Sequence, residues 1–151
     1  MRRGFMVLRE QNSIIFDGVL KAALASAEAQ EGDHSAALAT LELAILESGR
    51  TGQHWFDAEL HRTRGEILLE QDPSGFARAE EAFLAAIAIA HGQKARSFEL
   101  RAALSLAKLY CASGRSADAH GVLGPALAGF SPMPEFPEIK AAHDLLASLD
   151  A

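Results

Sequence analysis

A triplet of small, large and small side chains recurs three times in this sequence, with spacings of four and then three residues. The three triplets are Ala37, Leu41 and Ala44; Ala79, Phe83 and Ala86; and Ala119, Leu123 and Ala126. These spacings place the members of each triplet on one face of an α-helix. A helix can approach its neighbour closely where that face offers alanine, while the bulky side chain fills the hole beside it. The pattern therefore predicts three equivalent helix–helix contacts along the chain.

Small residues also mark the segments that precede the triplets. Ala25, Gly65 and Ala107 lie where the partner helix of each triplet is expected. A glycine in the middle of a helix costs about 1 kcal/mol relative to alanine. We therefore expect Gly65 to permit a close approach that a larger residue would block.

Turn signals divide the chain into helical stretches. Apolar residues recur at helical spacing from Phe16 onward, and no stretch alternates with a period of two residues. The predicted helices lie near residues 14–31, 34–48, 53–71, 75–91, 94–113, 116–130 and 136–149, with a short extra helix at 3–10. Asp33, Ser74 and Ser116 are candidate N-caps of the second, fourth and sixth of the seven main helices. Pro137 fits the first turn of the last helix.

Long helices joined by short turns pack as antiparallel neighbours. We therefore expect an all-α fold, an α-solenoid of about three helix pairs over residues 14–130. Residues 131–151 would form a proline-rich loop and a capping helix, and residues 1–13 the remnant helix of a preceding repeat.

Four segments carry a resemblance to a known family. Residues 55–69, 79–86, 97–107 and 123–125 resemble tetratricopeptide (TPR) repeat arrays in the C-terminal regions of large bacterial signalling proteins. In those proteins an adenylate/guanylate cyclase domain or a DNA-binding domain precedes an AAA-type ATPase and then the repeats. The triplets here recur every 40–42 residues, against roughly 34 in the usual repeat, which implies longer helices. The resemblance implies a non-catalytic interaction or regulatory module, the tail of such a protein or a stand-alone relative.

Charge and composition exclude several other classes. The net charge is −6 with a pI of about 5.5, the wrong sign for a general nucleic-acid binder. The first apolar stretch ends at Arg9, too short for a signal peptide, and no stretch approaches the roughly 18 apolar residues of a membrane span. A single cysteine, Cys111, excludes an internal disulfide framework. These features favour a cytoplasmic protein that contacts neither nucleic acid nor membrane.

The histidines suggest a metal site only weakly. Asp57 and His61 are four residues apart and could lie on one helical face, with His54 nearby. A zinc site needs three or four protein ligands, and no HExxH motif or Cys/His cluster supplies them. We expect no metal and no cofactor.

Catalytic groups are not indicated either. Glu59, Glu66 and Glu70 fall on one helical stripe, but neighbouring arginines make ordinary helix ion pairs the better interpretation. Cys111 has no charged neighbour that would lower its pKa, and no phosphate-binding GxxxxGK[ST] loop is present. This chain is not expected to be an enzyme, although a longer parent of the resembled kind would carry cyclase or ATPase domains.

The groove of the array is the candidate site. In solenoids of this kind the first helix of each pair lines the concave face. The residues predicted to line it are Trp55, Glu59, Arg62, Glu66, Arg101 and Lys108. Tryptophan and arginine are enriched in binding hot spots, so we expect recognition of a protein segment or of another domain of the same protein. Two alternatives stay open: Trp55 as a core residue with the arginines paired to Glu59 and Glu66, and a small-molecule effector sensor, which a deep apolar pocket near Trp55 would favour.

Self-association is a further expectation. Residues 5–8 are apolar and no helix precedes them in this sequence, so the first pair is expected to leave a flank open. We expect a two-fold homodimer through residues 5–24.

Overall fold

The computed structural model describes residues 16–130 and 136–150, and within them the chain is all-α. The helices are α2 (Asp17–Gln30), α3 (His34–Thr51), α4 (Asp57–Gln71), α5 (Phe76–Gly92), α6 (Arg96–Ala112), α7 (Ser116–Leu127) and α8 (Pro137–Leu149), with a 3₁₀ turn η1 (His54–Phe56) before α4. The all-α prediction is confirmed for these residues. The predicted helix at 3–10 and the predicted remnant at 1–13 lie outside them.

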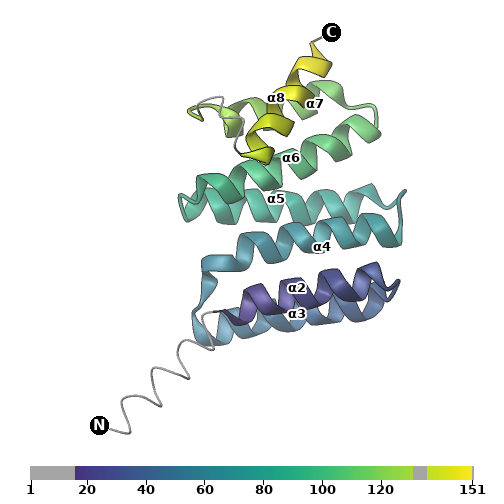
Figure 1. Ribbon diagram of the computed structural model, residues 1–151, viewed down its shortest axis with the longest axis vertical. Helices are drawn as coiled ribbons and strands as arrows, with labels where there is room; N and C mark the ends of the chain where they lie inside the picture. The colour runs from purple at the N-terminus through teal and green to yellow at the C-terminus, as the bar shows by residue number, and fades with distance from the viewer. Residues whose placement is uncertain (1–15, 131–135, 151) are drawn as a thin grey trace, which may run out of the picture.

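The helices follow one another in chain order from α2 and α3 at one end to α7 and α8 at the other (Figure 1). The most extensive contacts join consecutive helices: α2 with α3, α4 with α5, α5 with α6, and α6 with α7. The last helix, α8, packs against α6 and α7. This sequential, antiparallel-like packing is consistent with a helical repeat.

The side chains of the three triplets are buried as the sequence predicts. The central residues Leu41, Phe83 and Leu123 are 0–1% exposed. On the partner helices, Ala25 and Ala107 are fully buried. A Cβ on Gly65 would lie only 2.5 Å from the ring of Phe83, so the predicted close approach of α4 and α5 is confirmed.

Helix α4 connects two parts of the hydrophobic core. Its residues Leu60 and Ile67 pack with the core of α2 and α3. On another face, Leu68 joins the larger core, which runs through α5, α6 and α7 to Ile139 and Ala142 of α8. Each pair thus buries its flank against the next, and apolar packing is continuous along the stack.

The predicted caps are right at one helix and wrong at two. The Asp33 side chain accepts a hydrogen bond from the backbone N–H of Ala36 at 3.0 Å, as an N-cap does. Ser74 instead donates its backbone N–H and its hydroxyl to the carboxylate of Asp72 in a turn before α5. Ser116 is already the first helical residue of α7, whose N-cap, Arg115, makes no side-chain capping bond. Pro137 occupies the first turn of α8, as expected.

The start of α4 and the ends of α3 and α7 differ from the sequence expectation. Helix α4 begins at Asp57 and not near residue 53, because His54–Phe56 form the 3₁₀ turn η1. Helix α3 continues through Gly49 and ends at Gly52, whose φ of 71° gives the left-handed termination that glycine adopts without strain. Helix α7 ends at Leu127 rather than near residue 130, because Ala128 turns to an extended backbone and Gly129 has a φ of 87°.

The side of the first pair on which the dimer contact is expected is only partly described. Phe16, Leu20 and Leu24 are 52–65% exposed, while residues 5–15 of the expected dimer contact lie outside the described residues. Homodimerisation through residues 5–24 therefore stays a prediction. No helix of the described part of the chain is long and apolar enough to cross a membrane.

Replacing Gly65 by alanine should destabilise the protein, because the new Cβ would lie 2.5–2.9 Å from three ring atoms of Phe83. Gly121→Ala in α7 is the matched control, since a Cβ there meets nothing within 4 Å. Relative to that control, we expect Gly65→Ala to lower the free energy of unfolding by about 1–3 kcal/mol. Denaturant unfolding measures the difference, and equal midpoints for the two variants would contradict the expectation.

Candidate functional site

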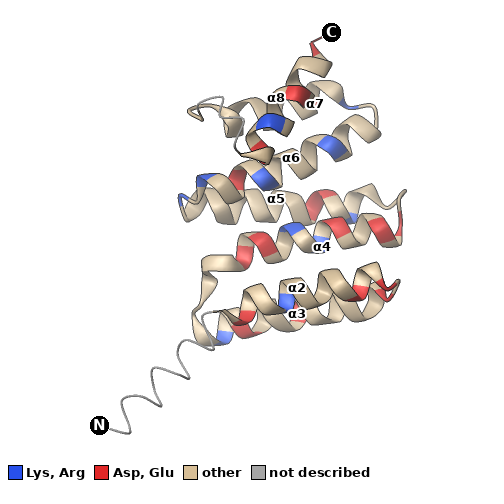
Figure 2. Ribbon diagram, viewed as in Figure 1, with Lys and Arg blue, Asp and Glu red and all other residues tan. Residues whose placement is uncertain are grey.

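The first helices of the pairs form a layer of their own. Helix α2 contacts α4, α4 contacts α6, and α6 contacts α8, whereas among the described residues α3, α5 and α7 contact one another far less. Acidic and basic residues lie along the visible faces of α4 and α6 (Figure 2). The predicted groove residues lie on α4 and α6, except Trp55, which lies in η1 just before α4.

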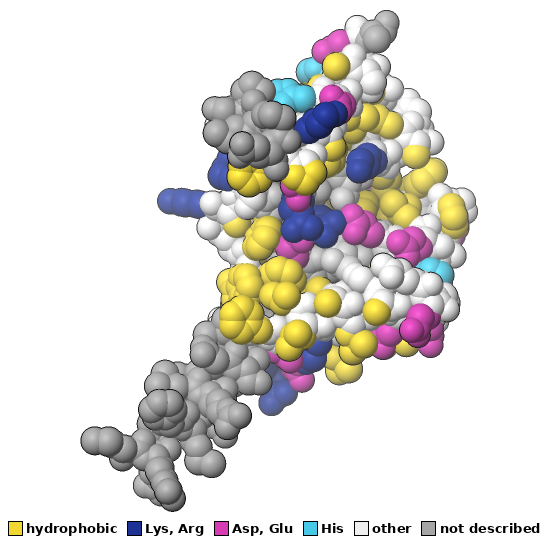
Figure 3. All heavy atoms as spheres, in the orientation of Figure 1, with side chains coloured by type: hydrophobic (Ala, Val, Ile, Leu, Met, Phe, Trp, Pro, Cys, Tyr) yellow, Lys and Arg dark blue, Asp and Glu magenta, His cyan; other side chains and the backbone are white. Residues whose placement is uncertain are grey.

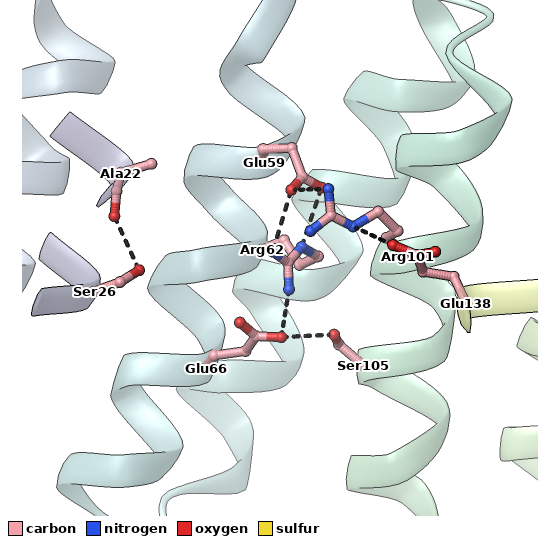
Figure 4. A network of polar contacts seen from close by, with 8 residues as sticks. All are labelled: Ala22, Ser26, Glu59, Arg62, Glu66, Arg101, Ser105 and Glu138. Atoms are coloured by element: carbon pink, nitrogen blue, oxygen red, sulfur yellow. Dashed lines mark hydrogen bonds and ion pairs between the residues drawn. The ribbon is translucent and has the colours of Figure 1, made fainter. Parts of the chain in front are cut away.

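Glu59 is the centre of an ion-pair network in this layer. Its residue is only 3% exposed. Nε and Nη2 of Arg62 donate to its two carboxylate oxygens at 3.0 and 3.1 Å, and Nη1 of Arg101, from α6, lies 2.8 Å from Oε2. Both oxygens of this buried carboxylate are therefore satisfied by guanidinium groups (Figure 4).

The network extends along α4 and across to α8. Arg62 also donates to Glu66 at 2.5 Å, and the Ser105 hydroxyl of α6 donates to the same Glu66 oxygen at 3.0 Å. Arg101 in turn lies 3.7 Å from the carboxylate of Glu138 at the start of α8. Three successive first helices are thus joined by three carboxylates, two guanidinium groups and one hydroxyl (Figure 4).

The charge of Arg62 is compensated by carboxylates of the network itself. Burial opposes the charge of this side chain, but hydrogen bonds and attraction to Glu59 and Glu66 outweigh it and raise the pKa of the guanidinium above its ordinary value. A buried ion pair of this kind stabilises the fold only while both partners are present. The pairing of Arg62 and Arg101 with glutamates matches the second half of the alternative that the sequence left open, in which Trp55 was to be a core residue and the arginines were to pair with Glu59 and Glu66.

Lys108 lies apart from this network. It is exposed on α6 and borders a pocket of about 300 Å³ between α4 and α6. The pocket is lined by Glu66, Leu69, Pro73, Phe76, Phe83, Ser105, Lys108, Leu109 and Ala112. Hydrophobic side chains are visible in the hollow between these two helices (Figure 3). Sequence reasoning identified Glu66 and Lys108 but not Phe76 and Phe83, because these two residues come from α5, outside the stripe of the first helices.

Trp55 is not a core residue, since it is 40% exposed. Its ring packs against Phe56 with 5.1 Å between centroids, and Phe56 meets Phe98 of α6 edge-on at 5.9 Å. Two hollows of about 270 and 460 Å³ adjoin the indole. Both are open to solvent and contain polar residues such as Gln53, so neither is the deep apolar pocket that would indicate an effector site near Trp55.

Ser48, His54 and Asp57 meet at the junction of α3 and α4, a cluster that the sequence analysis did not identify. The Ser48 hydroxyl lies 2.5 Å from Asp57, and Nδ1 of His54 lies 2.8 Å from the other oxygen of that carboxylate. In a hydrolytic triad the histidine uses its two ring nitrogens for serine and for aspartate. Here Nδ1 faces both, at 3.1 Å from the Ser48 oxygen, so the cluster fastens the turn before α4 and does not activate a nucleophile.

Metal-binding groups do not gather in the described part of the chain, where no three His, Cys, Asp or Glu side chains form a cluster that could hold an ion. His61 lies half-buried on α4. Its Nδ1 is the one buried side-chain nitrogen or oxygen without a hydrogen-bond partner among the described residues.

Fold and site together describe an all-α protein of sequentially packed helices whose first helices carry an internally paired charge network beside an apolar pocket. A scan against family models finds no match for this chain, and a search of curated proteins finds none either.

Glu59→Gln should lower the free energy of unfolding by about 3 kcal/mol, because two guanidinium groups would then face a buried neutral amide. The control is Asp144→Asn, which breaks the Lys140–Asp144 pair, in which both side chains are 64% exposed. That change should cost less than about 0.5 kcal/mol. Urea unfolding of both variants tests the expectation, and a loss for Glu59→Gln as small as the control's would show that the network contributes little.

His61 should make stability depend on pH. Burial and the neighbouring Arg64 lower its pKa, against a smaller opposing effect of Asp57, so the folded state disfavours the charged ring. Below the ordinary histidine pKa of about 6.5, the unfolded chain binds more protons than the folded one. This contribution to stability is present above that pH and is lost as the pH falls. The free energy of unfolding of His61→Gln should therefore decline less than that of the wild type between about pH 7 and pH 5; parallel declines would contradict this.

Proposed function

We propose that this chain is a non-catalytic interaction module, built as a TPR-like α-solenoid of three helix pairs with α8 as its cap. In this proposal it binds a protein segment, or another domain of the same protein, in the groove formed by α2, α4, α6 and α8. The observation that carries the proposal is the layer of first helices, which contact one another while the second helices do so far less.

That difference in contact indicates which face is concave. In a curved stack of helix pairs, the helices on the inside of the curve lie closer together than those on the outside. The first helices are the closer set, so the groove is expected on the face that carries Arg62, Arg101 and Lys108. The residues expected from the sequence to line the groove lie on or beside this layer.

The pocket between α4 and α6 and the hollows beside Trp55 fit a peptide better than a small-molecule effector. Small-molecule sites are usually concave and enclose about 300–1,000 Å³. The apolar pocket, at about 300 Å³, is at the bottom of that range, and the hollows beside Trp55 are open. An effector sensor remains the second candidate function, and the apolar pocket is the observation that favours it.

The wider setting follows from the resemblance of residues 55–69, 79–86, 97–107 and 123–125 to repeats of bacterial signalling proteins. On that basis we propose that the module works in the cytoplasm as part of a cyclase- or regulator-type protein. Its acidic net charge of −6 supports a protein partner rather than nucleic acid.

A groove-filling substitution tests the proposal. Ala112 is exposed and lines the pocket between α4 and α6, so Ala112→Trp should fill it. Ala88→Trp places the same side chain at an exposed position of α5, outside that pocket. In selection from a random peptide library, peptides enriched on the wild type should bind Ala88→Trp equally well and Ala112→Trp at least about tenfold more weakly, the loss of roughly one hot-spot contact.

Helix content and unfolding midpoints of both variants confirm that the fold survives. If the wild type enriches no peptide, or if Ala112→Trp binds the enriched peptides as well as the wild type does, the groove between α4 and α6 is not a peptide site.

A further inference from the structure

We infer that the pocket between α4 and α6 selects peptide segments that place a bulky apolar side chain and an acidic one on the same face. The apolar side chain enters the pocket, and the carboxylate pairs with Lys108. This inference rests on the proposed peptide-binding function and specifies which peptides the groove takes.

The interior of the pocket supplies the apolar half of the preference. Leu69, Phe76 and Leu109 line it from α4, α5 and α6, and the buried ring of Phe83 contributes to its wall. None of these side chains offers a hydrogen-bond donor or acceptor. A group placed there is therefore selected for apolar surface, at roughly 25 cal/mol for each Å² removed from water.

The rim supplies the charged half. Lys108 makes no ion pair with any described residue. Glu66 also lines the pocket, but its carboxylate already accepts hydrogen bonds from Arg62 and Ser105. The ammonium group of Lys108 is thus the cation at this rim that makes no ion pair with a described residue, and it favours an anionic group on the ligand.

The arginines of the layer cannot pair with a ligand carboxylate as readily as Lys108 can. Arg62 is bound by two carboxylates, and Arg101 is held by buried Glu59 and approached by Glu138. A ligand carboxylate would have to displace these partners and leave Glu59 unpaired in a buried position, which is costly. Lys108 requires no such exchange, so the anionic group of the ligand is expected beside the pocket and not at the centre of the network.

The size and openness of the pocket favour a side chain of a longer chain over a free small molecule. At about 300 Å³ it lies at the lower limit of ordinary ligand sites. An amphipathic carboxylate such as octanoate has the same two chemical features and could enter the same place. Compared with octanoate, a peptide makes additional contacts along the groove. The test therefore compares the binding of octanoate with that of the peptides.

The test uses four libraries of short peptides with acetylated and amidated ends, so that no terminal carboxylate contributes. Each library fixes two residues with one random position between them, so that both side chains lie on the same face of an extended chain. The fixed pairs are Leu-Glu, Leu-Gln, Leu-Lys or Ala-Glu, and the flanking positions are random. The wild type should retain Leu-Glu peptides about tenfold more strongly than Leu-Lys or Ala-Glu peptides, with Leu-Gln between them.

Lys108→Glu should reverse the order of Leu-Glu and Leu-Lys while leaving the preference for leucine over alanine. Arg78→Glu is the matched control, because it reverses the charge of an exposed cation on α5 that lines neither this pocket nor the hollows beside Trp55. It changes the net charge by the same amount and should leave the order unchanged. The unfolding midpoints of both variants report on the fold.

The outcomes separate this inference from the proposed function. Peptide binding that Ala112→Trp abolishes, combined with a charge preference that Lys108→Glu leaves unchanged, would overturn the inference alone. Peptide retention that Ala112→Trp does not reduce would overturn the proposed function and the inference with it. Octanoate and free Leu-Glu peptide can also be compared as competitors of a bound Leu-Glu peptide. If octanoate displaces it at a lower concentration than the free peptide does, the inference is overturned in favour of a small-molecule site.

Discussion

The close approach of α4 to α5 is the constraint on which the site depends. Gly65 leaves room for the ring of Phe83, which is 1% exposed and would collide with any Cβ at that position. The same ring reaches the wall of the pocket between α4 and α6. A helix pair with a larger residue at position 65 would hold the two helices further apart, and the apolar wall of the pocket would shift with Phe83. Packing inside one pair therefore shapes the surface between two pairs.

The second constraint is electrostatic. Glu59 is almost fully buried, and the fold accepts this because Arg62 and Arg101 approach it from α4 and α6. Ion pairs of this geometry need not add net stability compared with apolar packing, but they tolerate little displacement of either partner. The network therefore restricts how α4, α6 and α8 sit against one another. It also occupies both arginines at the centre of the layer, where three carboxylates face two guanidinium groups, so that neither guanidinium group is left unpaired there for a ligand.

Much of the fold could be predicted from the sequence, since helical apolar spacing, the three triplets and Gly65 are local patterns with one geometric interpretation. The wrongly predicted caps show the limit of local patterns. Ser74 could cap α5 or bond to Asp72 two residues away, and sequence spacing alone does not say which of these hydrogen bonds is preferred. Only about half of the candidate site could be predicted from the sequence. The charged stripe of α4 could be read from its period, but the pairing of Arg101 with Glu59 depends on the spacing of two helices. The apolar pocket depends on residues of three helices, and no local pattern contains it.

The position of Trp55 relative to the pocket suggests how the groove reads a ligand. Trp55 lies just before the start of α4, and Leu69 of the pocket lies near its end. At 1.5 Å per residue, these ends are separated by roughly 20 Å along the helix, the span of about six residues of extended chain. Between them lies the ion-pair network, whose two arginines are already paired with glutamates. A segment of that length could contact the indole at one end and the pocket with Lys108 at the other while crossing the network without disturbing it. Selectivity would then come from the two ends of the segment, and the arginines that look most like ligand anchors in the sequence would act by holding those ends at a fixed separation.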